Sequence, residues 1–169
     1  MGPGMAVKAV SGKKFSLIAF GVAQIAMDIE PLVRMIRGDR IVHGFTHTYV
    51  GAALIGALVL PLVRPLGAAI LRLWNREMIA SGHSWLADDD SISWTAASVG
   101  VFIGTFSHVL LDSLMHADLE PFAPFTSSNP LLHAVSLIAL HCVCLATGVL
   151  GLATWIAVRY HQRSVNKRL

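Results

Sequence analysis

The sequence predicts an all-α integral membrane protein, a four-helix bundle with a short amphipathic interfacial helix between its second and third helices. Hydrophobic residues make up 54% of the 169 residues and charged residues only 14%, whereas an ordinary soluble domain has roughly 25% charged residues. Four apolar segments also approach the roughly 20 residues that one bilayer crossing needs. The length fits one domain, and the mean hydropathy of +0.63 excludes a disordered chain.

The four expected helices differ in how well they suit hydrocarbon. The first is interrupted by Asp28 and Glu30, which leaves about 13 residues for the membrane core. The second is expected to end at Pro61 and Pro65, because proline removes a backbone donor. The stretch 66–80 is then expected to lie along the interface as a separate amphipathic helix. The four membrane helices are predicted at 15–36, 47–63, 94–115 and 131–158.

The chain is expected to form one membrane domain with basic ends. Residues 15–158 are expected to form the four-helix domain. Residues 1–14 are expected to be a basic N-terminal tail, part of which is a cloning remnant, and residues 159–169 a basic C-terminal tail. Ten of the 13 basic residues fall on the side that holds both ends, so the positive-inside rule predicts cytoplasmic termini in an inner (cytoplasmic) membrane protein. No cleavable signal peptide is expected, because the first apolar stretch carries charges and is followed by no cleavage pattern.

Charge and cysteine usage narrow the possible partners. The net charge is only +3 and the basic residues are scattered, so no nucleic-acid binding is expected. Cys142 and Cys144 would point in different directions on a helix, which favours packing over a disulfide or a metal pair. Membrane lipids are the expected partners, and the sequence is compatible with either a monomer or a homo-oligomer.

Ionisable residues in or near membrane helices are costly, so each is a candidate functional residue. At a rise of 1.5 Å per residue, Asp28 and His108 each lie about 20 Å from the start of their helices, which places them at similar depth. Seven such residues are expected at one membrane face, opposite the termini: Asp28, Glu30, His43, His47, His108, Asp112 and His116.

The spacing within this set favours a metal site. His43 and His47 are four residues apart, as are His108 and Asp112, so each pair would share one helical face. Imidazole and carboxylate ligands without thiolate suit Zn²⁺ best, with Mn²⁺ and Fe²⁺ as alternatives, and the ligands suffice for one or two ions. The predicted ligands are Asp28, His43, His47, His108 and Asp112, and the candidate catalytic residues are Glu30 and His116.

A site at the membrane interface favours an amphiphilic substrate, such as a phospholipid or a lipid-linked phosphate. Arg34, Arg37 and Arg40 are candidate substrate-binding residues, because a guanidinium group pairs with phosphate; the alternative is that they contact lipid phosphates only. The 117–130 loop, rich in Pro and Phe, is expected to form a lip over the site or an aromatic anchor in the interface.

Three segments of the chain resemble the signatures of the YdjM-like family, inner-membrane-associated proteins regarded as metal-dependent hydrolases. They are Met27-Asp28-Ile29-Glu30-Pro31, His43-Gly44-Phe45-Thr46-His47-Thr48, and Gly104-Thr105-Phe106-Ser107-His108-Val109-Leu110-Leu111-Asp112-Ser113. The third, with its His-x-x-x-Asp core, is the most specific. The family is similar to the zinc-dependent phospholipase C and nuclease superfamily, and this resemblance implies phosphoester hydrolysis.

These observations predict a membrane-embedded metal-dependent hydrolase, in which a metal-activated water attacks a phosphoester. The alternative is a divalent metal-ion carrier or sensor without catalysis. A carrier needs polar groups through the whole bundle, and 17–23, 56–60 and 97–104 offer almost none. A non-catalytic scaffold would explain the helices but not the clustered ligands.

Overall fold

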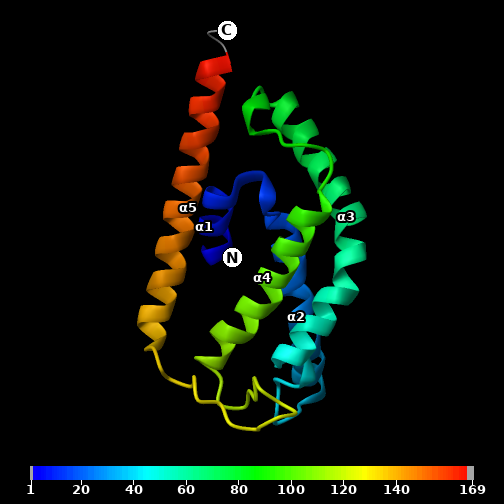
Figure 1. The fold of residues 1–169 in the computed structure, drawn as a ribbon, viewed down its shortest axis with the longest axis vertical. Helices are drawn as coiled ribbons and strands as arrows, with labels where there is room; N and C mark the ends of the chain where they lie inside the picture. The colour runs from blue at the N-terminus through cyan, green and yellow to red at the C-terminus, as the bar shows by residue number, and fades with distance from the viewer. Residues whose placement is uncertain (1, 167–169) are drawn as a thin grey trace.

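The computed structural model describes residues 2–166, which form five α-helices and no strand (Figure 1). The predicted all-α class is confirmed. Three short 3-10 turns, η1 (Gly12–Lys14), η2 (Phe45–His47) and η3 (Ser84–Leu86), lie between the helices. The helices are α1 (Gly2–Ser11), α2 (Leu17–Arg37), α3 (Tyr49–Ala80), α4 (Trp94–Ser113) and α5 (Leu137–Asn166).

Three of these helices, α3, α4 and α5, are long and apolar enough to cross a membrane. The sequence predicted four crossings. α2 is not among the three, because Asp28, Glu30, Arg34 and Arg37 fall within its 21 residues. It nevertheless packs along α4 and α3 as part of the same bundle.

Small residues bring α2 and α4 into close contact. A methyl group added at Gly104 would lie 3.0 Å from the Cβ of Ala23, and one added at Gly100 would lie 2.9 Å from the Cβ of Ala19. Ala97 is also fully buried in this core. Glycine and alanine let membrane helices approach until their backbones nearly touch. The helix carrying Asp28 is thereby held directly against the helix carrying His108.

Hydroxyl side chains define where the core helices begin. Ser16, Thr48 and Ser93 precede α2, α3 and α4, and each accepts a hydrogen bond from the backbone N–H three residues on. Such caps satisfy a donor that the helix itself leaves free. They explain why α2 and α4 begin within two residues of the predicted positions.

The prediction for α3 is wrong at its C-terminal half. The helix continues through Pro61 and Pro65 to Ala80, so 66–80 is not a separate interfacial helix. Both prolines lie on the exposed side, and packing of α3 on α4 and α2 supports the helix on its other side. Membrane helices tolerate proline in this way because neighbouring helices compensate the lost hydrogen bond.

The two ends of the chain are also more ordered than predicted. Residues 2–11, expected within a basic tail, form α1, which packs chiefly against α5. Glycine makes this contact possible, since a methyl group at Gly151 would lie 2.5 Å from the backbone of α1. α5 begins at Leu137 rather than at 131 and continues to Asn166; residues 167–169 of the expected tail lie outside the described range.

Candidate metal centre

The candidate site lies where the C-terminal ends of α2 and α4 meet the N-terminal end of α3, at the lower end of Figure 1. Two connecting segments, 38–48 and 114–136, close this end. Tyr49 donates its backbone N–H to the carbonyl oxygen of Pro121 at 2.9 Å, and Asn129 donates to the carbonyl oxygen of Ser113 at 2.9 Å. The loops are therefore tied to the helix ends that carry the site.

His108 is held in one orientation by α2. The side-chain amide of Gln24 donates to the carbonyl oxygen of Gly104 at 2.9 Å, so its carbonyl oxygen faces Nδ1 of His108, 2.6 Å away. An amide oxygen only accepts, and Nδ1 must therefore carry the proton. This leaves Nε2 of His108 with a free lone pair.

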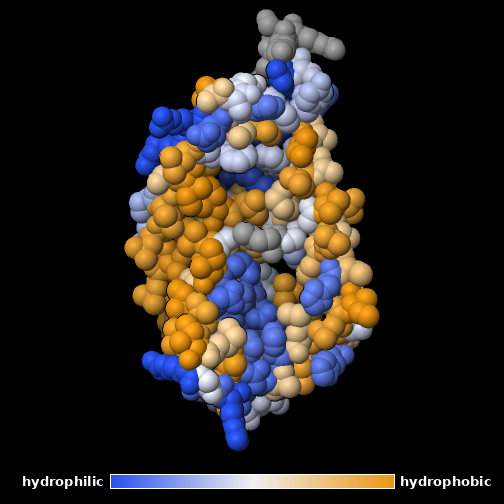
Figure 2. Space-filling model, turned by 180° about the vertical axis from the view of Figure 1, so that it is seen from behind, coloured by the Kyte–Doolittle hydropathy of each residue, from blue (hydrophilic) through white to orange (hydrophobic). Residues whose placement is uncertain are grey.

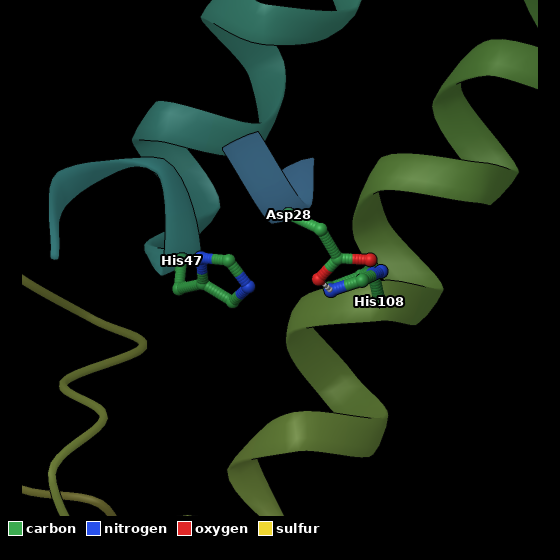
Figure 3. A group of neighbouring side chains, drawn as sticks. All are labelled: Asp28, His47 and His108. Atoms are coloured by element: carbon green, nitrogen blue, oxygen red, sulfur yellow. Dashed lines mark ion pairs between the residues drawn. The ribbon is translucent and has the colours of Figure 1, made fainter. Parts of the chain in front are cut away.

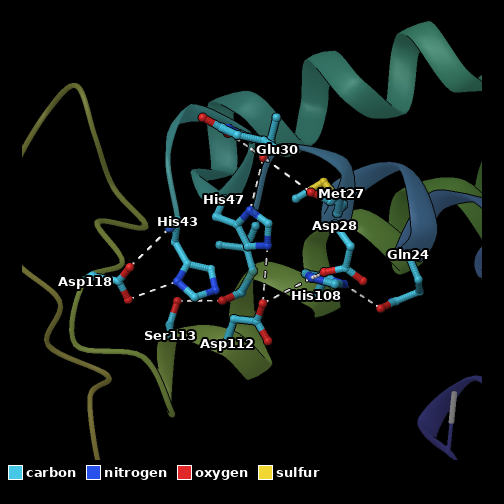
Figure 4. A network of polar contacts seen from close by, with 12 residues as sticks. Gln24, Met27, Asp28, Glu30, His43, His47, His108, Asp112, Ser113 and Asp118 are labelled. Atoms are coloured by element: carbon cyan, nitrogen blue, oxygen red, sulfur yellow. Dashed lines mark hydrogen bonds and ion pairs between the residues drawn. The ribbon is translucent and has the colours of Figure 1, made fainter. Parts of the chain in front are cut away.

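His47 is held in the same way through Thr46. The Thr46 hydroxyl donates to Oε2 of Glu30 at 2.7 Å, and its oxygen can then accept from Nδ1 of His47, 3.1 Å away. Glu30 also accepts the backbone N–H of Thr46 at 2.8 Å. Glu30 thus fixes the turn that carries His47 (Figure 4). With the proton on Nδ1, Nε2 of the fully buried His47 ring keeps its lone pair.

The two free nitrogens face two carboxylates. Nε2 of His108 lies 3.2 Å from Oδ1 of Asp28 and 3.1 Å from Oδ2 of Asp112. Nε2 of His47 lies 3.4 Å from the same oxygen of Asp112. Figure 3 shows the His47 ring pointing across to Asp28 and His108.

This arrangement brings lone pairs together without donors between them. Within residues 2–166, the Nε2 atoms of His47 and His108 are buried and have no hydrogen-bond partner, despite the short distances to carboxylate oxygens. Two buried lone pairs beside two carboxylates repel one another unless a proton or a metal cation lies among them. The donor set is therefore chemically suited to a divalent metal ion.

His43 and His116 extend the cluster toward the loops. The ring of His43 lies 5.0 Å from that of His47 and 4.2 Å from that of His116, measured between centroids. Asp118 orients His43, with Oδ1 2.9 Å from Nδ1 and Oδ2 accepting the backbone N–H of His43 at 3.1 Å. Burial alone would raise the pKa of Asp118, but these hydrogen bonds and one from Val42 hold it at about 2. Asp118 is therefore an anion at neutral pH.

Each of the three imidazoles nearest the centre thus has an outer acceptor on Nδ1. These acceptors are Gln24 for His108, Thr46 for His47 and Asp118 for His43. Outer-shell partners of this kind are typical of metal-binding histidines, because they fix the tautomer and the ring orientation.

Three overlapping groups of side chains could hold an ion, with ligand atoms within 4.8 Å of one another. His47 and His43 each belong to two of them, so the groups form one continuous cluster rather than separate sites. The groups are Asp28, His47 and His108; His43, His47 and Asp112; and His43, His116 and Asp118.

All five predicted ligands lie in this cluster. The prediction that His43 and His47 share a helical face is wrong, since His47 belongs to η2 and His43 precedes it; the turn itself brings their rings together. His116 lies beyond the end of α4, but its backbone N–H still bonds to the carbonyl oxygen of Asp112 at 2.9 Å.

The remaining predicted residues lie around the cluster. Glu30 belongs to none of the three groups and pairs with Arg34 at 2.7 Å. Arg34 also donates to the carbonyl oxygen of Ile41 at 3.3 Å, so its guanidinium is already engaged. Arg37 and Arg40 are exposed at the same end of the molecule.

Sequence reasoning missed three residues of the site: Gln24, Thr46 and Asp118. Gln24 is a polar residue inside an apolar helix, four residues before Asp28, and this was a usable signal. Thr46 and Asp118 lie in irregular segments, where spacing gives no indication of which backbone or ring nitrogen an oxygen will meet.

The comparisons agree with the resemblance seen in the sequence. A family model described as YdjM inner membrane protein matches residues 6–166. No significant match is found among curated proteins or among solved structures.

Proposed function

The chain belongs to the YdjM inner membrane protein family, and from the geometry of its His/Asp cluster we propose that it is a membrane-embedded metal-dependent hydrolase. The observation that carries this proposal is the pair of buried, unpartnered Nε2 atoms of His47 and His108 facing Asp28 and Asp112. The proposed substrate is a phosphoester of a lipid or of another amphiphilic molecule.

In this proposal Asp28, His47, His108 and Asp112 hold one divalent ion, Zn²⁺ before Mn²⁺ or Fe²⁺, and His43 provides a further ligand at the centre or at a second ion. An ion with such ligands supplies a nucleophile from water at neutral pH and polarises a phosphoryl oxygen. Three histidines with carboxylate support match the ligands of catalytic zinc sites. Asp28 has a 63% exposed side chain, so the centre is open on its side.

We assign proton transfer to His116. It is half-buried, lies against the His43 ring, and is not held by α2. An imidazole at the rim of the centre can act as a general acid, which suits protonation of a leaving alkoxide. Glu30 is then a positioning residue for Thr46 and His47, in place of the catalytic role expected from the sequence.

The substrate class is inferred from the position of the cluster. α4, which carries His108 and Asp112 near its C-terminal end, is long and apolar enough for a membrane, so in this proposal the cluster lies near the depth where phosphate head groups begin. Arg37 and Arg40 are free to pair with an anionic head group at this end. With the C-terminal end of α5 cytoplasmic, as the charge distribution favours, the centre at the other end of the bundle would lie near the opposite face of the inner membrane.

The packing behind the site argues against ion transport. The turns that follow the cluster toward the other end of the bundle contain the buried residues Ala19, Ala23, Ala97 and Val101. An ion moving past them would lose its ligands in an apolar core, at a cost of several kcal/mol or more. This observation favours a hydrolase over a carrier.

Elemental analysis of the purified protein tests metal binding, and hydrolysis of bis(4-nitrophenyl) phosphate and of phospholipids tests the reaction. We expect bound metal and turnover in the wild type, and loss of both in Asp112→Asn and His108→Ala. Asp39→Asn and His161→Ala, at exposed positions, are the matched controls. Metal without turnover of any ester would favour a sensor, and absence of metal would reduce the cluster to a network of ion pairs.

A further inference from the structure

A small cavity opens beside the candidate metal centre. It has a volume of about 140 Å³, and His108, Asp112 and Gln24 line its inner side. The rest of the lining is mainly apolar, with Leu111 from α4, Met115 from the turn that follows it, and Leu140 from α5. The cavity therefore leads from the ligand side chains outward between two helices.

The two helices that border this cavity are not packed together. α4 packs on α2 and α3, whereas α5 packs chiefly on α1 and makes at most marginal contact with α4 (Figure 1). Seen from behind, the hydrophobic surfaces on either side flank a hollow whose lower part is hydrophilic (Figure 2). α1 lies between α5 and α2 in the upper part of this space, and below α1 the cavity opens in the side of the bundle (Figure 1).

We propose that this opening is a lateral entrance, through which the alkyl chain of a phosphoester reaches the centre directly from the bilayer. The inference rests on the proposed function. α4 and α5 are both candidate membrane-crossing helices, so in this proposal the opening faces the edge of the hydrocarbon core just below the head groups, where a lipid chain is the available occupant.

The size of the cavity limits what it holds. A pocket that encloses a drug-sized ligand measures about 300–1,000 Å³, whereas this one measures about 140 Å³. It accommodates the part of one chain next to the phosphate, and the rest of the chain stays between the helices and in the bilayer. This geometry assigns the substrate to amphiphiles with a flexible alkyl chain attached close to the phosphate.

His141 supplies a polar contact on the α5 side of the entrance. It lines the cavity, and its Nδ1 donates to the carbonyl oxygen of Leu137 at 2.7 Å. Its Nε2 then carries a lone pair, so it can accept a hydrogen bond from a hydroxyl group of the substrate but cannot donate one to an ester oxygen.

The two natural cysteines provide a matched test. Cys144 lines the cavity, whereas Cys142, two residues earlier on α5, is exposed elsewhere. Single-cysteine proteins (Cys142→Ser and Cys144→Ser), loaded with Zn²⁺ in phosphatidylcholine nanodiscs, are alkylated with N-ethylmaleimide in the presence of hexadecyl phosphate, hexadecanol or inorganic phosphate. At a hexadecyl phosphate concentration ten times its dissociation constant, alkylation of Cys144 should slow about tenfold by mass action.

Cys142 should react at an unchanged rate, and neither hexadecanol nor inorganic phosphate should protect Cys144. Equal protection of both thiols, or protection by hexadecanol alone, would mean non-specific coverage by lipid and would overturn the entrance. So would a Cys144 that is unreactive before any amphiphile is added, because the cavity would then be closed. None of these outcomes depends on turnover, so the entrance and the hydrolase activity fail separately.

A chain-length series then links the entrance to the reaction. Leu140→Trp fills the cavity, and Ile138→Trp, two residues away and 79% exposed, is its control. We expect Leu140→Trp to lose hydrolysis of hexadecyl 4-nitrophenyl phosphate and to keep hydrolysis of the methyl ester, with unchanged zinc content. Equal loss of both esters with zinc retained, or no loss of either, would contradict lateral entry while leaving the hydrolase proposal intact.

Discussion

Gln24 offers a direct test of how the site is built. Its side chain bonds to the proposed ligand His108, and it is not itself a proposed ligand. Its amide bridges Gly104 and His108, with hydrogen bonds of 2.9 and 2.6 Å. Gln24→Leu keeps the approximate volume and removes both bonds. The His108 ring then loses the acceptor that holds its proton on Nδ1, and Nε2 is no longer fixed toward Asp112.

The expected loss is one of metal affinity. Removing an outer-shell partner of a metal-binding histidine costs about 10–100-fold in affinity, or about 1.4–2.7 kcal/mol. The folded state without metal loses only about 0.5–1.5 kcal/mol for the side-chain hydrogen bond. Zinc affinity is measured by competition with a chromophoric chelator, and the unfolding midpoint of the metal-free protein is recorded in parallel.

Gln24→Glu separates orientation from packing. The carboxylate of this variant cannot donate to Gly104, but it keeps the acceptor for Nδ1 of His108. The zinc affinity of Gln24→Glu should therefore stay within about threefold of the wild type. If Gln24→Leu binds zinc as tightly as the wild type, while Asp112→Asn does not bind it, the orienting role is wrong. If both Gln24 variants weaken binding equally, the effect comes from helix packing.

Four further outcomes follow from the same geometry. Gly104→Leu should separate α2 from α4, since even a methyl group there lies 3.0 Å from Ala23; overpacking of this kind costs about 1–3 kcal/mol, seen as a lower unfolding midpoint together with lost zinc. Gly44→Ala should also weaken zinc binding, because its methyl group would overlap the Glu30 carboxylate and displace the turn before His47; an unchanged affinity would show that this turn adapts freely. Asp118→Asn should lower stability at pH 7 by about 1–2 kcal/mol. Because the pKa of Asp118 is depressed to about 2, this contribution is complete above about pH 4 and is lost as the pH falls toward 2, so wild type and variant should converge there in acid unfolding experiments. Chelation should lower the unfolding midpoint of the wild type, by the equivalent of about 2.7 kcal/mol when zinc had been present at 100 times its dissociation constant, and should leave Asp112→Asn unaffected.

The sequence was most informative where local chemistry and packing agree. α2 and α4 were located closely, because apolar segments mark both helices in the sequence and the structure shows a serine cap at the start of each. The i, i+4 spacing of His108 and Asp112 correctly predicted that both face one centre. The prediction that Asp28 and His108 lie at the same level of the bundle was also correct, since Oδ1 of Asp28 is 3.2 Å from Nε2 of His108.

Long-range packing explains the failures. Pro61 and Pro65 predicted a helix end, but their exposed positions let neighbouring helices support α3 on the other side. The N-terminal segment looked like a basic tail because its contacts are with α5, more than a hundred residues away in the chain. Asp118 was missed for the same reason: it is recognised as a site residue only when the loop after α4 is placed against His43.

The glycine and alanine positions on α4 restrict where residues can be inserted or deleted in this protein. Ala96, Gly100, Gly104, His108 and Asp112 follow one another at intervals of four residues, so a single strip of the helix surface carries both the contact with α2 and the ligands. Inserting or deleting one residue between Gly104 and His108 would rotate the ligands by about 100° around the helix axis. Length changes within this strip are therefore incompatible with the centre, and the register of the helix is coupled to its chemistry.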